Sequence, residues 1–293
     1  MNRFRAWSKR LGESSMRIVF LLAACVSILC VGLICAFLFI SGVPAMKEIG
    51  FGQFLLGRVW KPGAEIYGIY PMIVGSVIVT GIALLLGVPV ALLTAIELAF
   101  FCPERVYRLL RPAIELLAGI PSVVYGFFGI VVLVPAVRTL GAPWDGRGNS
   151  ILTASILLAI MILPTIVGVV EPALRAVPRS YYEGALALGA THERSVYTAV
   201  VPAAGSGVMA GIVLGLGRAM GETMAVIMVA GNQARMPKGI LQGIRTLTGN
   251  IVIEMGYAEG LHREALIATG VVLFVFILII NLAFSALKRR ESA

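Results

Sequence analysis

The chain has 293 residues, of which 59% are hydrophobic and only 13% are charged. It has 24 Lys and Arg residues and 15 Asp and Glu residues. Soluble domains carry about 25% charged residues, so this composition excludes a water-soluble globule, and it excludes a disordered chain, which requires low hydrophobicity. The long unbroken apolar runs also exclude an outer-membrane barrel, because its strands are short and alternate in polarity.

Six apolar runs are long enough to cross a membrane as helices, since a hydrocarbon core of about 30 Å needs about 20 residues. Lipid offers the backbone no hydrogen-bond partner, so each crossing segment must satisfy its own amides by helix formation. The predicted fold class is therefore an all-α integral membrane protein with six transmembrane helices. In chain order the predicted spans are Ile18–Ser41, Tyr70–Phe101, Ala113–Val137, Ser150–Leu174, Gly205–Ala230 and Ala265–Leu287.

The cationic residues predict the orientation of these spans. Lys and Arg are denser on the side that holds both termini, as in the groups that follow the second and fourth runs. Cytoplasmic loops are enriched in these residues, so we expect both termini to be cytoplasmic. The excess charge of +9 has the same explanation and requires no nucleic-acid partner.

The cytoplasmic loop at about 178–204 carries signals for two short helices. Ser180 and Glu183 have the spacing of a capping box, which predicts a helix over 181–188. Gly189 can then adopt the left-handed conformation that ends it, and Thr191 offers the N-cap of a second helix. The expected product is an elbow suited to insertion into a partner's cleft, or else a loop that lies on the membrane surface.

The same loop resembles the EAA loop of bacterial ABC importer permeases. The motif Glu183-Gly184-Ala185, then Gly189, then Val201-Pro202 has the family spacing throughout, and it departs from the family residues at Gly184, Ala199 and Val201. The resemblance implies a type I ABC importer permease fold whose coupling helix docks on a separate ATPase. The residues implied in that coupling are Tyr182, Glu183, Gly184, Ala185 and Gly189.

The fifth run has two stripes of glycine. Gly207, Gly211 and Gly215 recur every four residues and share one helix face, while Gly217 and Gly221 repeat the spacing on a neighbouring stripe. Small residues at this spacing let a second helix approach closely. Either helix packing or room for a solute path would explain them.

Arg218 lies at the centre of the same run, where a cation costs about 3 kcal/mol on an insertion scale. Glu222 follows one helical turn later on the same face, so the two can form an ion pair. The sequence leaves two interpretations open. The pair is structural, or Arg218 faces a substrate; a forked guanidinium suits an oxyanion such as phosphate.

The stretch from Gly217 to Val226 resembles the signature of PstC-type permeases of phosphate importers. The resemblance places Arg218, Glu222 and Thr223 on the substrate pathway. It implies as partners a PstA-type sister permease, two copies of a PstB-type ATPase and an extracytoplasmic phosphate-binding protein. It also implies a multi-pass location in the bacterial cytoplasmic (inner) membrane and a docking surface on the outer loop Gly231–Glu264.

Three segments follow from this resemblance. Residues 1–69 hold the N-terminal tail, the first helix and an outer loop, residues 70–287 form the permease domain, and residues 288–293 form a basic tail. The chain has no GxxxxGK[ST] loop for ATP and no HExxH, and its two histidines lie in expected loops. We therefore expect no catalytic or metal site and no cofactor, with ATP and Mg used by the partner ATPase.

Other transport functions remain open at this point. A permease for sulfate or molybdate, or a PstA-like sister subunit, would share most of these features. An ion-coupled secondary transporter is the rival with another energy source, because Glu222 and Glu97 can carry protons within a membrane.

Overall fold

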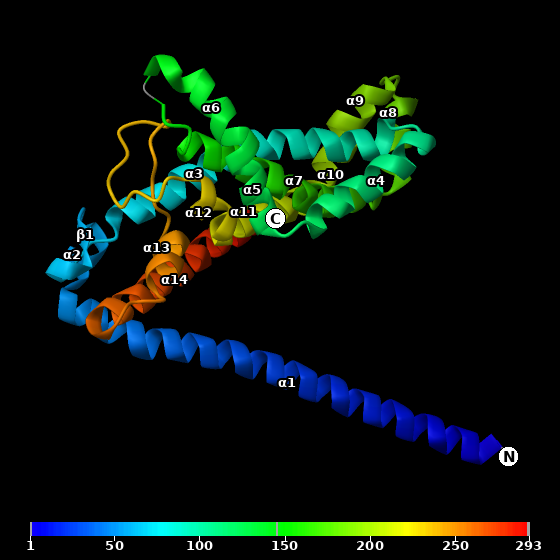
Figure 1. Cartoon of the computed structure of the whole chain (residues 1–293). Helices are drawn as coiled ribbons and strands as arrows, with labels where there is room; N and C mark the ends of the chain where they lie inside the picture. The colour runs from blue at the N-terminus through cyan, green and yellow to red at the C-terminus, as the bar shows by residue number, and fades with distance from the viewer. Residues whose placement is uncertain (1, 145, 292–293) are drawn as a thin grey trace.

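The computed structural model describes residues 2–144 and 146–291, and most of them are helical. Figure 1 shows a compact bundle from which the N-terminal helix extends. Five helical segments are long and apolar enough to span a membrane. They are α1 (Asn2–Ile49), α3 (Tyr70–Ile96) with its π-helical extension Glu97–Phe101, the segment Ser122–Gly141, α7 (Ile151–Arg175) and α14 (Gly260–Glu291).

The fifth predicted span is not the continuous helix that we expected over Gly205–Ala230. α11 (Gly205–Gly221) ends in the middle of that run, and the separate helix α12 (Met224–Val229) follows it. At its other end α11 meets the helical stretch His192–Ala203 at an angle of 71°, and only together do these two segments have the length of a span. The prediction was wrong because apolar composition does not reveal where backbone hydrogen bonding is interrupted.

The third predicted span also begins in the wrong place. Residues 113–119 belong to α4 (Glu104–Gly119), an amphipathic helix whose last residue is Gly119. Pro121 forces the residue before it out of the helical region, and Ile120 has an extended backbone with φ −68° and ψ 127°. The span itself starts one residue later and comprises α5 (Ser122–Phe128), a π-helical turn at Gly129–Leu133 and α6 (Val134–Gly141).

Short elements form the end of the molecule opposite the elbow. They include α2 (Phe51–Leu56), the antiparallel hairpin of β1 (Trp60–Lys61) and β2 (Ile66–Tyr67), and α13 (Leu247–Glu254). These elements share a small core with the C-terminal turns of α1 and the first turns of α14. Its buried members include Ala45, Phe54, Trp60, Tyr67, Leu247 and Leu266.

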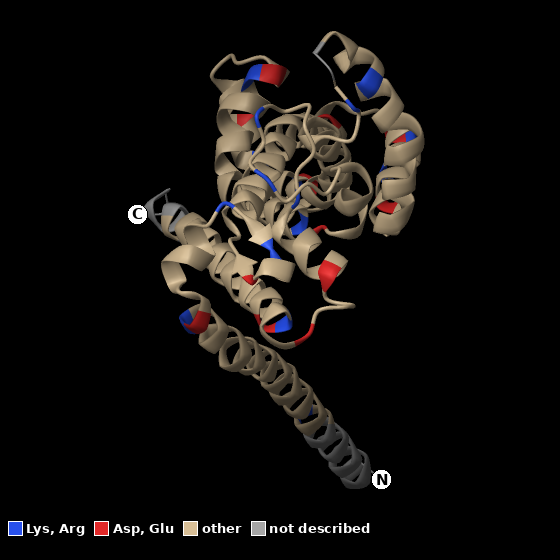
Figure 2. Cartoon of the chain, turned by 60° about the vertical axis from the view of Figure 1, so that its left-hand side comes forward, with Lys and Arg blue, Asp and Glu red and all other residues tan. Residues whose placement is uncertain are grey.

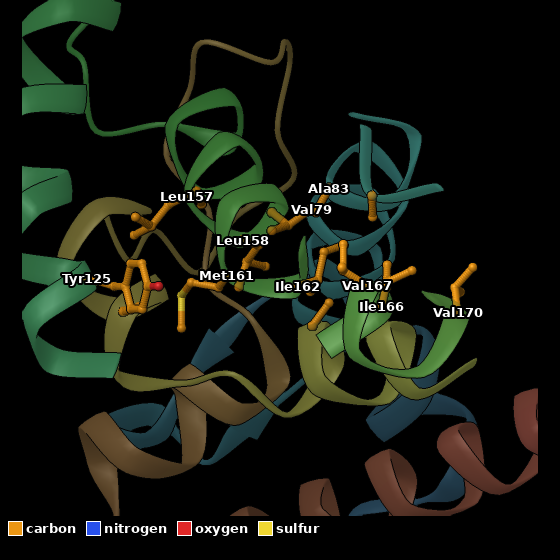
Figure 3. Close-up of a cluster of buried hydrophobic side chains, with 14 of the residues drawn as sticks. Val79, Ala83, Tyr125, Leu157, Leu158, Met161, Ile162, Ile166, Val167 and Val170 are labelled. Carbon is orange, nitrogen blue, oxygen red and sulfur yellow. The ribbon is translucent and has the colours of Figure 1, made fainter. Parts of the chain in front are cut away.

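The main hydrophobic core surrounds α7. In its most apolar stretch 67% of the residues are buried, whereas none are buried in the most apolar stretch of α1. α7 packs on one side against α3 and on the other against α11. Figure 3 shows how its side chains, Leu158 and Ile162 among them, interleave with Val79 and Ala83 of α3.

The first glycine stripe of α11 explains its close contact with α7. A Cβ built on Gly207 would lie 2.3 Å from the Cβ of Ala173, and one on Gly211 would lie 2.6 Å from a methyl group of Val170. The helix-packing interpretation is thus confirmed for this stripe. Around Gly217 and Gly221, in contrast, no atom lies within 4 Å of a built Cβ, so the second stripe faces open space.

Charged residues are sparse, and long uncharged stretches separate them along the ribbon (Figure 2). The N-terminal tail expected within 1–69 continues the helix α1 from Asn2. The basic tail expected at 288–293 continues α14 up to Glu291, and its last two residues lie outside the described residues.

Candidate functional site

Arg218 borders a cavity of about 800 Å³ between α7, α11 and α14. Among the lining side chains that the structure describes, three are polar, and each comes from a different helix: Thr165 of α7, Arg218 of α11 and Asn281 of α14. The others are small or apolar: Met209, Ala210, Val213, Leu214, Gly217 and Phe284. The cavity therefore has one cation in a wall that is otherwise mostly apolar.

The guanidinium of Arg218 is held by α7. Its Nη1 donates a hydrogen bond to Oγ1 of Thr165 over 3.0 Å. Among the ion pairs of the described residues, none joins Arg218 to Glu222. The ion pair that one helical turn of spacing allowed does not form, because α11 ends at Gly221 and the backbone at Glu222 is extended, with ψ 125°.

Glu222 instead stabilises the break between α11 and α12. Its Oε1 accepts hydrogen bonds from the backbone amides of Thr223 (3.1 Å) and Ala225 (3.2 Å), which start α12. The hydroxyl of Thr223 donates to the carbonyl of Gly221 (3.1 Å). Glu222 and Thr223 thus satisfy backbone groups that the break would leave unpaired, and only Arg218 of the three lines the cavity.

The elbow has the predicted shape but a different first cap. α8 (Arg179–Ala187) begins two residues before 181, and Pro178 precedes it without a side-chain cap. Ser180 therefore lies inside the helix, so the predicted capping box is wrong. The end of α8 is as predicted: Gly189 has φ +84°, and the amides of Gly189 and Ala190 bond back to Leu186 and Ala185 in a Schellman motif.

The second helix of the elbow starts as predicted. Oγ1 of Thr191 accepts a hydrogen bond from the amide of Arg194 over 3.4 Å and caps α9 (His192–Ser195). A π-helical turn and α10 (Val201–Ala203) follow, so Pro202 lies one residue before the helix ends.

His192 joins the elbow to the end of α3, a contact that the sequence gave no reason to expect. Its Nδ1 is 2.7 Å from the hydroxyl of Tyr182, and its ring lies edge-on to Phe101, with the centroids 4.7 Å apart. Arg175, Tyr182 and His192 also border a cavity of about 390 Å³ beneath the elbow. A displacement of α8 would therefore reach α3 and α7 directly.

The tip of the elbow is exposed. Glu183, Gly184 and Gly189 are accessible, Tyr182 and Ala185 are half-buried, and Leu188 is 90% exposed. An apolar side chain this accessible beside small residues can fill a complementary cleft, which is the property that coupling requires.

A buried carboxylate fastens α4 to the core. Glu171 of α7 is fully buried. It accepts hydrogen bonds from the hydroxyl of Tyr107 (3.0 Å) and Nε of Arg175 (2.6 Å), and it contacts Nη1 of Arg111. Arg175 also donates to the carbonyl of Leu98 at the end of α3. The position of Glu171 beside cationic loops in the sequence predicts that it pairs with nearby arginines. The sequence does not predict that it is completely buried.

A second buried carboxylate organises the opposite end of the molecule. The carboxylate of Glu254 in α13 accepts hydrogen bonds from Nε1 of Trp60 (2.8 Å) and Nε2 of His262 (2.8 Å). It also forms an ion pair with Nη1 of Arg245. Burial raises the pKa of this carboxyl, but the three hydrogen bonds and the charge of Arg245 outweigh it, so the pKa lies below its usual value. This network joins the hairpin, the loop before α13, α13 itself and α14.

Comparisons with known proteins agree with this architecture. The family model described as binding-protein-dependent transport system inner membrane component matches residues 87–292. The probable ABC transporter permease protein YqgH of Bacillus subtilis is 36% identical over 96% of this chain and 94% of its own length. The phosphate transport system permease protein PstC of Haemophilus influenzae is 36% identical over 81% of each chain.

Solved structures show the same fold at low identity. An inward-facing MetNI methionine ABC transporter chain matches with a TM-score of 0.62 and 19% identity, over 80% of this chain and 99% of that one. A bacterial ABC transporter for import of the polysaccharide alginate matches with a TM-score of 0.61 and 15% identity, over 96% and 99%.

Proposed function

The chain belongs to the family of binding-protein-dependent transport system inner membrane components, and from this membership we propose that it is the membrane permease subunit of an ATP-driven importer of inorganic phosphate. The observation that carries the proposal is the coverage of its PstC relatives, such as the protein of Mesorhizobium japonicum, which is 35% identical over 88% of this chain. Arg218, at the edge of a cavity within the membrane domain, supplies the matching chemistry for an anion.

The partners follow from this assignment. We propose a PstA-type sister permease that completes the pathway, a PstB-type ATPase dimer that uses ATP and Mg, and an extracytoplasmic phosphate-binding protein. The chain itself hydrolyses nothing in this arrangement. Both termini and the elbow face the cytoplasm, in line with the excess of Lys and Arg on that side.

The mechanism is alternating access. The loaded binding protein docks on the outer loop Gly231–Glu264, and ATP binding brings the two ATPase subunits together beneath the elbow. Because Tyr182 and His192 connect the elbow to Phe101, movement of α8 displaces the inner end of α3. The pathway then opens outward, phosphate passes Arg218, and hydrolysis returns the complex to the inward-open state.

Reconstituted transport tests the proposal. Vesicles that contain the chain with its sister permease and ATPase are loaded with ATP and given binding protein and labelled phosphate. We expect uptake that requires ATP and no proton gradient, and a loss of at least about tenfold, or ~1.4 kcal/mol, in Arg218→Ala. The matched control is Arg108→Ala, which removes an exposed cation of α4. Uptake driven by a proton gradient without the ATPase would contradict the proposal, as would normal uptake by Arg218→Ala.

A further inference from the structure

The cavity beside Arg218 has the composition of a small-ligand site. Thr165, Arg218 and Asn281 enter it from three helices, and the rest of its lining is small or apolar. Binding pockets commonly combine an apolar wall with a few convergent polar groups that set orientation and specificity. Among the described lining residues, the polar groups are two neutral side chains and one cation, and none is a carboxylate.

Asn281 is an unusual side chain for its position. It is exposed within an apolar helix, and its neighbours Leu278, Ile279 and Leu282 are 46%, 57% and 60% exposed. An amide without a partner in an apolar environment costs about 1–3 kcal/mol by mutational measures. Within the part of the chain that the structure describes, the Asn281 amide is in none of the hydrogen bonds found, although it borders the cavity.

Thr165 differs from three other threonines of the membrane helices in the hydrogen bonds that its hydroxyl makes. The hydroxyls of Thr94, Thr139 and Thr269 each donate to the carbonyl four residues earlier. The Thr165 oxygen accepts from Arg218 instead, and among the described residues its hydroxyl donates no hydrogen bond. Its proton therefore stays available for an acceptor in the cavity.

These groups divide into donors and one free acceptor. The remaining N–H groups of Arg218, the Thr165 hydroxyl and the Asn281 NH₂ can donate to oxyanion oxygens, and the Asn281 carbonyl oxygen can accept. Phosphate and arsenate keep at least one acidic hydroxyl at neutral pH, whereas sulfate has none. A site with an acceptor therefore distinguishes them, because the acceptor finds a hydrogen-bond donor on phosphate or arsenate and none on sulfate.

We propose that Thr165 and Asn281 complete an oxyanion subsite with Arg218, and that Asn281 selects protonated oxyanions by accepting their hydroxyl proton. This inference rests on the proposed function, since it assigns specificity to the same pathway. Thr165 positions the guanidinium and donates one hydrogen bond. Asn281 contacts the hydroxyl of the anion.

Protection of a cysteine in the cavity tests the subsite directly. Val213, which lines the cavity, is replaced in Val213→Cys after the four native cysteines are changed to alanine. The permease–ATPase complex without binding protein is treated with a thiol reagent in the presence of phosphate, arsenate or sulfate. We expect phosphate and arsenate to slow the reaction at concentrations at least about tenfold lower than sulfate.

The variants give the decisive result. Asn281→Ala should bring the half-protecting concentrations of phosphate and sulfate together, and Thr165→Val should raise both about tenfold, or ~1.4 kcal/mol. Thr165→Ser keeps the hydroxyl and should have the half-protecting concentrations of the parent. This variant distinguishes the loss of the hydroxyl from a change in packing. The control Thr198→Val removes an exposed hydroxyl outside the cavity and should change nothing.

Equal protection by phosphate and sulfate in the parent, or values unchanged in Asn281→Ala and Thr165→Val, would overturn the subsite. Uptake by the unsubstituted protein with its binding protein is measured in parallel. If uptake is normal and protection fails these expectations, the subsite is wrong while the proposed function stands. If ATP-driven phosphate uptake is absent in the unsubstituted protein, the proposed function itself fails.

Discussion

Arg218 and Glu222 are one helical turn apart in sequence, yet their side chains bind different partners. Arg218 reaches across to Thr165 of α7 and borders the cavity, while Glu222 caps the amides that begin α12. Their roles are therefore separable. The cation acts on the content of the cavity, and the carboxylate maintains the break that ends α11 beside it.

Substitutions of Glu222 can distinguish a cap from a counter-ion. Glu222→Ala removes the acceptor of two backbone amides and should cost about 1 kcal/mol, the usual loss for an N-cap. Glu222→Gln keeps an acceptor oxygen and should lose less than half of that. The measurement is the thermal midpoint of the purified complex. Equal losses in the two variants would indicate that the negative charge matters and the cap does not.

Glu171 provides a second test at the residue scale. Glu171→Gln leaves Arg111 and Arg175 without their carboxylate in a buried site, and breaking such pairs costs about 3–5 kcal/mol when both partners are buried. Because Arg175 is 45% exposed, we expect about 2–3 kcal/mol, seen as a lower thermal midpoint. Glu104→Gln is the matched control, since its pair with Arg108 is exposed and should contribute at most about 1 kcal/mol.

At the scale of elements, the elbow is a stiff connection. α8 and the helix after it are separated by the left-handed turn at Gly189, and the contact of Tyr182 with His192 fixes their angle. His192 also packs on Phe101. A partner that pushes on the exposed tip would therefore move the inner ends of several membrane helices together.

Two glycines of the elbow should respond in opposite ways to alanine. Gly189→Ala places a side chain at φ +84°, which costs about 1–2 kcal/mol and should weaken the coupling of ATP hydrolysis to uptake. Gly184→Ala lies in a helix with open space around its Cβ and should gain up to about 1 kcal/mol from helix propensity. The readout is phosphate imported per ATP hydrolysed. A normal ratio in Gly189→Ala would show that the turn is not needed.

At the scale of the whole molecule, two buried carboxylates fasten its opposite ends. Glu171 joins α4 and the end of α3 to α7, and Glu254 joins the hairpin and outer loop to α14. Between them the packing is almost entirely apolar, and the outward faces of α1 and the segment Ser122–Gly141 expose large apolar side chains. Lipid and other subunits would cover such faces in the membrane.

The stability contributed by Glu254 should depend on pH with a definite sign. Its pKa is lower in the folded protein than the usual value for a glutamate, so its contribution is complete above that usual value and is lost as the pH falls through the folded pKa. The difference in thermal midpoint between the parent and Glu254→Gln should be constant from pH 7 to about pH 5 and shrink at lower pH. A difference that already shrinks near pH 6 would contradict this expectation.

Local patterns in the sequence determined the helical membrane fold, the glycine stripe that packs on α7, and the turn at Gly189. Each depends on a few neighbouring residues and on the chemistry of lipid or backbone. The start of the third span was also a local matter, because Pro121 disfavours helical geometry in the residue before it. The break at Glu222 and the convergence of Thr165, Arg218 and Asn281 were decided only by the tertiary structure. These features depend on where a helix ends and on which helices pack against it. The free energy that decides this comes from contacts between residues far apart in the chain.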